Sequence, residues 1–576
     1  MTTILTGRAA APGAAVAPVF VLETDVGHSP IPERRRGSAD AEVARLRSAL
    51  GSAGEQLREL AVKVAEEAGE SEAEIFEAHA EFAADPELLN LATEAIEDGA
   101  SAERATTSAF GTFRDLLSES SSEYLAARAD DLDDVRDRVV AILQGRTMLV
   151  SVPKTCSVIA ARELTPSRTA SLPMALVAAL VTETGSATSH AAILARSLGI
   201  PAIVGCEGLL AAVSTGTTVA VDGRSGELFI DPDEALCAEI TGRMEREEAR
   251  QHELEAIRDE EGRTADGHRV ELAANLGSPD DLEPALAAGA EGSGLVRTEF
   301  LFQDRRTEPD VDDQVAFYVQ VLEAFPGRRV VFRTMDVGAD KPLAFVDRDA
   351  EENPALGLRG IRLHLARPEL FRTQLRALLR ARAAVADRDA GRMAIMFPLI
   401  AKLSELIEAR AHLDAVAAEE GIDLAELEVG MMIEVPSAAL GAARLAKHVD
   451  FFSIGTNDLL QYTFAVDRLH GGVADIADPF EPDVLQLIAQ VIQAGHDDGA
   501  WVGVCGEAAS EPLIAAALVG LGADELSMTR VAIPEVKDTL RNLTLERCQT
   551  AVQQALAQGE DADQVRTILA EVLELD

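Results

Sequence analysis

The pattern of apolar and polar positions divides the chain into regions of different texture. Between residues 38 and 145, apolar side chains recur at three- and four-residue spacing, as in "AEVARLRSALGSAGEQLRELAVKVAEEAG" and "DLDDVRDRVVAILQG". This spacing is typical of amphipathic helices that bury one face. We therefore expect an α-helical bundle within residues 21–145.

The segments on either side of the bundle have shorter apolar runs, with glycine and proline between them. Residues 1–20 and 146–230 contain strand-like runs such as "SVIAA", "MALVAALVTET", "IPAIVG" and "TTVAVDG". Strands alternating with a helix predict one small α/β domain, into which the bundle is inserted. The charged run "EALCAEITGRMEREEARQHELEAIRDEEG", within residues 231–262, predicts a single solvated linker helix.

Residues 263–576 carry eight further strand-like runs with helical segments between them. These runs are "VELAANL", "GSGLVRT", "RRVVFRTMDVG", "MAIMFPLI", "LEVGMMIEV", "DFFSIGTND", "WVGVCGEA" and "ELSMT". Eight strands with intervening helices over about 300 residues are the pattern of a (β/α)8, TIM-like barrel. The predicted fold class is therefore α/β: an α/β domain with an inserted helical bundle, a linker helix and a carboxyl-terminal barrel.

Charge limits the partners of such a protein. The 576 residues are 47% hydrophobic and carry a formal net charge of −46. Nucleic acids and anionic membranes attract basic surfaces, so the charge argues against both as partners. Residues 38–145 alone hold 25 Asp or Glu against 9 Lys or Arg. Either a basic protein docks on this bundle, or the acidity only keeps the chain soluble or reflects a salty cytoplasm.

The amino terminus and the cysteines favour the cytoplasm. The start, "MTTILTGRAAAPG", lacks a basic region followed by an apolar core, and no apolar run approaches the roughly 20 residues that span a bilayer. The five cysteines, Cys156, Cys206, Cys237, Cys505 and Cys548, are scattered without C-x-x-C spacing. We expect reduced thiols, with neither a disulfide framework nor a zinc site.

Polar side chains follow the predicted barrel strands, where the working residues of such barrels lie. They are Arg297, Arg333, Asp336, Glu434, Asn457, Asp458, Cys505 and Glu507. Glu434 and Asp458 offer the oxygen ligands that Mg²⁺ prefers. Arg297, Arg333 and the more distant Arg468 carry planar guanidinium groups suited to phosphate and carboxylate. The set predicts a phosphorylated anion beside a magnesium ion; the alternative is that arginines and carboxylates merely pair at the barrel mouth.

Cys505 admits two interpretations from its surroundings in the sequence. A lone cysteine after an apolar run is usually a small buried hydrophobic residue. At a strand end beside the predicted site, a thiol can also donate a proton, because its ordinary pKa of about 8.5 keeps it protonated at neutral pH. The residues themselves leave both roles open.

The stretch "TETGSATSHAAILARSLGIPAIVG" places His190 in the first turn of a predicted short apolar helix. Thr188 or Ser189 can cap this helix, which Gly199 and the following Ile-Pro pair end. An anion on the imidazole would meet free backbone N–H groups and the positive end of the helix dipole. Neutral imidazole is also a nucleophile toward phosphorus at neutral pH. His190 is thus a candidate phosphoryl acceptor, the alternative being a histidine of the core.

Two of these stretches resemble signatures of a known superfamily. "GSATSHAAILARSLGIPAIVG" resembles the phosphohistidine motif shared by enzyme I of the bacterial sugar phosphotransferase system, pyruvate phosphate dikinase and phosphoenolpyruvate synthase. "DFFSIGTNDLLQYTFAVDR" is similar to the second signature, in the phosphoenolpyruvate-binding barrel. Dikinase and synthase carry a large nucleotide-binding region before the first motif, whereas here mostly acidic helices without a glycine-rich phosphate loop precede it.

Those helices favour one branch of the superfamily. "EIFEAH" and "YLAARADDLDDV" are similar to segments of the enzyme I bundle that docks the carrier protein HPr. The chain is therefore identified as a member of the enzyme I family, the phosphoenolpyruvate-protein phosphotransferases. With no sensory domain expected before the bundle, the sugar branch is favoured over the nitrogen branch.

The resemblance implies a role for each matching residue. His190 corresponds to the histidine that is phosphorylated on Nε2, and Thr169 in "TPSRTA" to the hydroxyl that orients it. Cys505 corresponds to the acid that protonates the enolate, and Glu434 and Asp458 to the magnesium ligands. The implied phosphoenolpyruvate contacts are Arg297, Arg333, Arg359, Asn457, Asp458 and Arg468. The sequence departs from the family pattern at Ser186 and Ala187, where many members have a second glycine and an arginine. The nucleophile is intact, but the resemblance does not imply how the phosphate is cradled.

The implied reaction is phosphoryl transfer from phosphoenolpyruvate to His190 and then to a histidine of HPr. Pyruvate is released, and this is the first step of sugar uptake by the phosphotransferase system. The resemblance also implies Mg²⁺ dependence and a homodimer formed through the barrel. It divides the chain into a phosphohistidine domain (1–20 and 146–230), an HPr-binding bundle (21–145), a linker (231–262) and a phosphoenolpyruvate-binding and dimerisation barrel (263–576). The alternatives are a dikinase-like enzyme, which would need ATP, and a non-catalytic phosphoenolpyruvate sensor, which would not become phosphorylated.

Overall fold

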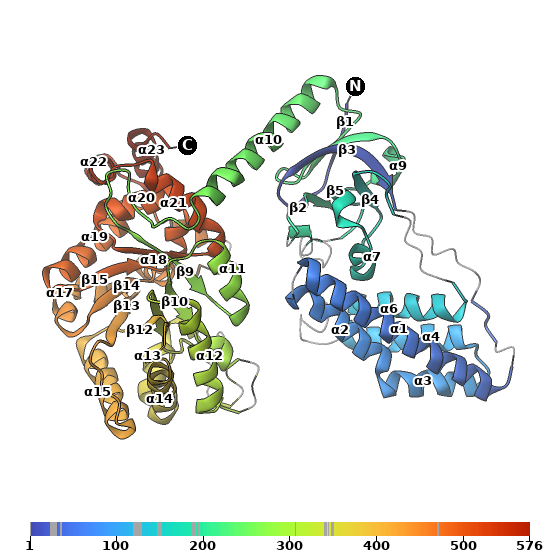
Figure 1. Ribbon diagram of the computed structural model, residues 1–576, viewed down its shortest axis with the longest axis horizontal. Helices are drawn as coiled ribbons and strands as arrows, with labels where there is room; N and C mark the ends of the chain where they lie inside the picture. Colours follow the sequence, from blue (N-terminus) through green and yellow to red (C-terminus); the bar gives the residue numbers. More distant parts are fainter. Residues whose placement is uncertain are drawn as a thin grey trace. The chain divides into compact units, whose positions relative to one another are not determined.

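A computed structural model divides the chain into two units, residues 1–250 and 251–576. It describes all residues except 1, 23–30, 35–36, 69, 119–128, 147–151, 186–191, 193–194, 197, 304, 306, 339–342, 344, 347–350, 387, 469, 471 and 576. The charged run after residue 231 forms one mostly exposed helix, α10 (Glu234–Ala256), which crosses the boundary between the units (Figure 1). In the part of the chain that is described, no helix combines the length and apolar character needed to cross a membrane.

The helical pattern of the first unit becomes a bundle. Its described helices are α1 (Ala39–Ala68), α2 (Glu70–Ala84), α3 (Pro86–Glu97), α4 (Ala102–Ser118) and α6 (Ala129–Leu143). Their apolar faces share one core of mostly alanine, leucine and valine side chains. The start of α3 follows from its sequence, because the Asp85 carboxylate accepts hydrogen bonds from the backbone N–H groups of Glu87 and Leu88 and Pro86 has no N–H to satisfy.

The strand-like runs around the bundle form an eight-stranded sheet in the order β1-β8-β7-β3-β4-β5-β6-β2. The strands are β1 (Thr3–Thr6), β2 (Arg8–Ala11), β3 (Ala14–Val21), β4 (Ser157–Ala161), β5 (Val177–Thr182), β6 (Ala202–Val204), β7 (Thr218–Asp222) and β8 (Glu227–Ile230). Strands β3, β4, β5 and β6 pair in parallel, and the outer strands pair antiparallel. Because β3 and β4 are neighbours, the bundle is an insertion between two adjacent strands.

Two short helices accompany this sheet, α7 (Pro166–Ala170) and α9 (Leu209–Ala212). Helix α7 contacts the bundle. The Lys63 ammonium group donates a hydrogen bond to the Ala170 carbonyl at 2.7 Å, and the Ser167 backbone N–H donates one to Asp134 at 3.3 Å. Side-chain contacts therefore join the bundle to the α/β part of the first unit.

The second unit is a closed barrel of eight parallel strands, which confirms the predicted fold class (Figure 1). The strands are β9 (Glu271–Leu276), β10 (Ser293–Arg297), β11 (Arg329–Arg333), β12 (Arg392–Phe397), β13 (Glu428–Ile433), β14 (Phe451–Ile454), β15 (Trp501–Val504) and β16 (Glu525–Met528). The helices are α11 (Leu282–Ala287), α12 (Val311–Ala324), α13 (Gly360–Ala366), α14 (Pro368–Ala384), α15 (Leu403–Glu420), α16 (Pro436–Leu440), α17 (Ala442–Leu445), α18 (Thr456–Phe464), α19 (Pro482–Asp497), α20 (Pro512–Leu521), α21 (Ile533–Arg541), α22 (Leu545–Gln558) and α23 (Ala562–Leu573).

A charged cluster closes the barrel interior at the amino ends of its strands. Arg329 lies 3.0 Å from the carboxylates of both Glu271 and Glu428, and its guanidinium group stacks 4.0 Å above the centre of the Trp501 ring. Glu525 lies 3.8 Å from the same arginine, is 1% exposed, and has no hydrogen-bond partner among the described residues. Burial, and then the nearby Glu271 carboxylate, raise the pKa of Glu525 to about 8. Side chains thus fill the barrel at the amino ends of its strands, whereas an open cavity lies at the carboxyl ends.

Candidate active site at the barrel mouth

A cavity of about 600 Å³ opens at the carboxyl ends of the barrel strands. Barrels of this type carry their active sites at this end, because loops from all eight strands meet there. The cavity is lined by every barrel residue that the sequence analysis singled out as a site residue: Arg297, Arg333, Arg359, Glu434, Asn457, Asp458, Arg468 and Cys505. The fold therefore brings together side chains that are up to about two hundred residues apart in the sequence.

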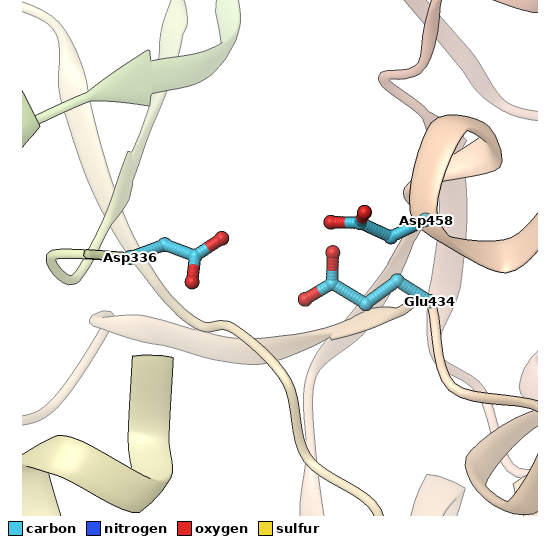
Figure 2. A group of neighbouring side chains, drawn as sticks. All are labelled: Asp336, Glu434 and Asp458. Atoms are coloured by element: carbon cyan, nitrogen blue, oxygen red, sulfur yellow. The ribbon is translucent and has the colours of Figure 1, made fainter. Parts of the chain in front are cut away.

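Three buried carboxylates converge in this cavity. Asp336 follows β11, Glu434 follows β13 and Asp458 lies in the first turn of α18. Each offers an oxygen atom that lies within 4.8 Å of those of the other two. Figure 2 shows the three carboxylate groups facing a common space. Asp336 was among the polar residues at the predicted strand ends, but the sequence did not indicate that it joins the other two acids.

The three carboxylates fit a divalent cation. Oxygen ligands suit Mg²⁺, which usually takes one or two carboxylates and completes its coordination with water and substrate oxygens. One buried oxygen of Asp458, Oδ1, accepts no hydrogen bond from any described residue, although Arg468 Nη1 lies 3.4 Å from it. Burial raises the pKa of Glu434 to about 8, and the Asp336 and Asp458 carboxylates add to this shift. A cation would offset that repulsion, so the donor set is consistent with a metal site.

Two arginines, Arg333 and Arg359, pair with the same carboxylates, and their side chains are only 11% and 10% exposed. Arg359 Nη2 lies 2.7 Å from Asp336 and 3.1 Å from Asp458, and Arg333 Nη1 lies 3.1 Å from Asp336. Burial by itself would raise the pKa of Asp336, but the charges of Arg333 and Arg359 hold it below its ordinary value. Asp336 is therefore ionised and bridges the two guanidinium groups.

The other two arginines of the cavity are more exposed. Arg297, at the end of β10, is exposed and forms no ion pair with any described residue. Arg468 lies 3.4 Å from Asp458, with 41% of its side chain exposed. Four guanidinium groups thus surround one cavity, and the two outer ones remain accessible to an incoming anion.

Cys505 lies at the edge of the cavity, immediately after β15. It is 2% exposed, and burial raises the pKa of its thiol to about 11. The thiol therefore keeps its proton at neutral pH. The backbone of Cys505 is also held in place, because the Asn275 side chain donates a hydrogen bond to its carbonyl oxygen at 3.0 Å. Ser527 in turn donates to Asn275 at 2.7 Å.

The loop after Cys505 is joined to the loop after β14. Asn457 donates a hydrogen bond to the Glu507 carboxylate at 3.0 Å, and the Glu507 backbone N–H donates one to the Asn457 side chain at 2.9 Å. A β-carbon on Gly506 would lie 1.8 Å from the Thr456 hydroxyl oxygen, so only glycine permits this contact between the loops. The segment that carries Asp458 and the segment that carries Cys505 thus support each other.

Comparisons with known proteins agree with this geometry. Three family models of the phosphoenolpyruvate-utilising enzymes match the chain: the N-terminal domain over residues 6–128, the mobile domain over 153–226 and the phosphoenolpyruvate-binding domain over 251–545. The phosphoenolpyruvate-protein phosphotransferase of Geobacillus stearothermophilus is 43% identical over 562 residues, 96% of this chain and 95% of the relative. The chain belongs to this family.

Other members of the phosphoenolpyruvate-protein phosphotransferase family match over similar lengths. The protein of that name from Streptomyces coelicolor is 43% identical over 576 residues and covers 100% of both chains. The one from Haloferax volcanii is 44% identical over 540 residues, 92% of each chain. The resemblance inferred from two motifs is thus confirmed, and it extends over nearly the whole sequence.

The remaining predicted site residues lie in the first unit. The candidate phosphoryl acceptor of this family member, His190, and the departures at Ser186 and Ala187 lie outside the described residues. Thr169 lies in α7, where it is 1% exposed and its hydroxyl group donates a hydrogen bond to the Thr165 carbonyl at 3.0 Å. Its role toward His190 stays a prediction.

Two polar residues of the cavity, Glu299 and Glu511, were missing from the sequence interpretation, and Glu299 contacts the buried cluster. Glu299 accepts hydrogen bonds from Arg333 Nη2 at 3.0 Å and from the Asp336 backbone N–H at 2.6 Å. It therefore holds both the guanidinium group and the turn that carries Asp336. Its position two residues after Arg297, just beyond β10, was the available signal, because that is also a strand end.

Proposed function

We propose that this chain transfers the phosphoryl group of phosphoenolpyruvate first to its own His190 and then to a histidine of the carrier protein HPr. Membership in the family makes the chain a transferase that uses phosphoenolpyruvate. The observation that carries the rest is the convergence of four arginines, three carboxylates and a protonated thiol in one cavity. This set matches the carboxylate, the phosphate and the reactive carbon of phosphoenolpyruvate.

Substrate binding relies on the guanidinium groups. Arginine binds carboxylate and phosphate through paired hydrogen bonds, which also orient the anion. In the proposal Arg297, Arg333, Arg359 and Arg468 hold the two anionic groups of phosphoenolpyruvate, and Asn457 supports them. Glu434 and Asp458 would hold Mg²⁺. When bound, the ion neutralises charge that develops on the phosphoryl and enolate oxygens.

The chemical steps then involve two protein groups. His190 Nε2 attacks phosphorus, the P–O bond to the enolate breaks, and the phosphoryl group becomes attached to the imidazole. Positioning and electrostatic stabilisation supply most of the catalysis in such transfers. Cys505 then delivers its proton to the terminal carbon of the enolate, which gives pyruvate. The raised pKa of the thiol supports this assignment, because the proton is still present when the enolate forms.

The first unit would serve the second half of the reaction. The proposed phosphohistidine domain comprises residues 1–20 and 146–230, and the acidic bundle of residues 21–145 would be the docking surface for a basic HPr. His190 must reach the barrel and later HPr, so its domain is expected to move about the linker of residues 231–262. We also propose that the protein works in the cytoplasm, as a dimer formed through the barrel of residues 263–576.

Intact-protein mass spectrometry tests the proposal directly. The full chain is incubated with phosphoenolpyruvate and Mg²⁺, in parallel with His190→Ala and with a sample that contains a chelator. One added phosphoryl group in the wild-type sample with Mg²⁺, and in neither control, is expected. An ATP requirement would instead indicate the dikinase-like enzyme, and bound but unreacted phosphoenolpyruvate would indicate a sensor.

A further inference from the structure

The cavity holds more acidic than basic side chains, although its proposed substrate is an anion. Its lining includes the four arginines described above and six acidic residues: Glu299, Asp336, Glu434, Asp458, Glu507 and Glu511. An anion that enters such a cavity without a cation meets net repulsion. The arginines that should receive it are also engaged already, since Arg333 and Arg359 both pair with carboxylates.

Asp336 is the carboxylate that engages both inner arginines. Its Oδ2 atom lies 2.7 Å from Arg359 Nη2 and 3.1 Å from Arg333 Nη1, and Oδ1 accepts a further hydrogen bond from Arg359 Nε at 3.2 Å. A carboxylate between two guanidinium groups has the arrangement that these groups would make with a bound carboxylate or phosphate. Asp336 thus lies where it competes with the substrate.

The same side chain has a second set of neighbours. One of its oxygen atoms lies within 4.8 Å of oxygens of Glu434 and Asp458, the two proposed metal ligands. Its backbone is anchored, because the Asp336 N–H donates to Glu299 at 2.6 Å. A rotation of the side chain, with the backbone in place, therefore changes how closely the carboxylate approaches the arginines and the cation.

We propose that Asp336 is an internal counter-anion, which neutralises Arg333 and Arg359 until substrate arrives and then faces the metal ion. The inference rests on the proposed function, because it takes phosphoenolpyruvate as the anion and a divalent cation as its companion. Each ligand therefore removes an unfavourable interaction that opposes binding of the other ligand. The anion frees Asp336 from the arginines, and the cation stabilises the freed carboxylate. Phosphoenolpyruvate and the cation consequently bind with positive coupling, which must be equal in both directions.

The test measures binding rather than turnover. The full-length His190→Ala chain lacks the proposed acceptor, so phosphoenolpyruvate can be titrated by calorimetry with and without Mg²⁺. Mn²⁺ can be titrated by electron paramagnetic resonance with and without phosphoenolpyruvate. In this background, Asp336→Asn is expected to tighten metal-free phosphoenolpyruvate binding about tenfold and to weaken Mn²⁺ binding about tenfold, the effect of losing one close charge interaction.

A matched control lies in the same acidic cluster. Glu434 forms no ion pair with either inner arginine within the described residues, and its Oε1 atom accepts a hydrogen bond from the Leu399 N–H at 2.6 Å. Glu434→Gln should therefore weaken Mn²⁺ binding and tighten metal-free phosphoenolpyruvate binding much less than Asp336→Asn does, because Glu434 does not contact the guanidinium groups that receive the anion. In Asp336→Asn, phosphoenolpyruvate binding should become tighter and Mn²⁺ binding weaker. Replacing a residue that only maintains the site would instead weaken the binding of both ligands.

Three results would overturn the inference. First, folded Asp336→Asn could bind metal-free phosphoenolpyruvate no more tightly than the chain with Asp336. The counter-anion role of Asp336 would then be wrong, but the proposed function would stand as long as phosphoenolpyruvate still binds with Mg²⁺. Second, if Asp336→Asn does not fold, the coupling is measured in the His190→Ala chain that retains Asp336. Equal phosphoenolpyruvate affinity with and without Mg²⁺ in that chain would exclude the coupling. If that chain binds no phosphoenolpyruvate even with Mg²⁺, the proposed function fails and the inference fails with it.

Discussion

Replacing Glu525 by glutamine should change how the stability of the barrel depends on pH. Glu525 is fully enclosed at the amino end of the barrel, and both carboxylate oxygens lack hydrogen-bond partners among the described residues. Its pKa in the folded protein is about 8, against 4.5 for an ordinary glutamate, so the folded state retains a proton that the unfolded chain releases. A proton bound more tightly by the folded state stabilises it at low pH, and this stabilisation is lost as pH rises toward 8.

The magnitude follows from the two pKa values. Between pH 4.5 and 8 the free energy of unfolding should fall by up to about 1.4 kcal/mol per pH unit through this group, or about 5 kcal/mol in all. Glutamine has almost the same shape and no proton to lose. The stability of Glu525→Gln relative to wild type should therefore rise steadily between pH 5 and 8. The contributions of groups that do not interact with Glu525 cancel in the comparison.

The chain contains its own probe for this measurement. Trp501 is the only tryptophan in the sequence and lies in the same cluster, stacked against Arg329 and Phe451. Urea unfolding followed by tryptophan fluorescence therefore reports on the barrel and not on the first unit. Parallel pH profiles for wild type and Glu525→Gln would show that Glu525 does not carry the proton, and the reasoning from burial would be wrong.

Three further predictions concern turnover and docking. Cys505→Ala should still become phosphorylated by phosphoenolpyruvate but form pyruvate about 100-fold more slowly, a typical loss for a missing general acid. Rapid-quench assays of the phosphorylated protein and of pyruvate check this, and an unchanged rate of pyruvate formation would exclude Cys505 as the acid. Glu507→Ala should lower kcat/KM about three- to tenfold, because Asn457 loses one hydrogen bond. Glu507→Gln keeps an oxygen acceptor, so its kcat/KM should stay near that of wild type. Equal losses of kcat/KM in the two variants would show that the charge matters instead of the hydrogen bond. Association with HPr, followed by stopped flow, should slow at least about tenfold between low salt and 0.5 M salt if the acidic bundle attracts a basic partner, and a salt-independent rate would contradict electrostatic docking.

The sequence determined the order of elements and the chemical type of the site. Alternating apolar runs in residues 263–576 specified eight strands, and a closed parallel barrel places the carboxyl ends of all of them at one face. Arg297 is the last residue of β10, and Glu434 and Cys505 directly follow β13 and β15, so their convergence could be inferred without coordinates. Helical periodicity in residues 38–145 likewise specified the bundle, because local spacing decides which face of each helix is buried.

Only the tertiary structure decided how the charged side chains pair. Asp336 bridges Arg333 and Arg359 because β11 and the segment before α13 bring their side chains within hydrogen-bond distance, and no sequence spacing specifies such a contact. Glu525 loses its charge at neutral pH because closure of the barrel between β9 and β16 removes it from water and places Glu271 nearby. Spacing along the chain records which residues share a face, whereas pairing and protonation depend on distances and desolvation that exist only after the strands close into a barrel.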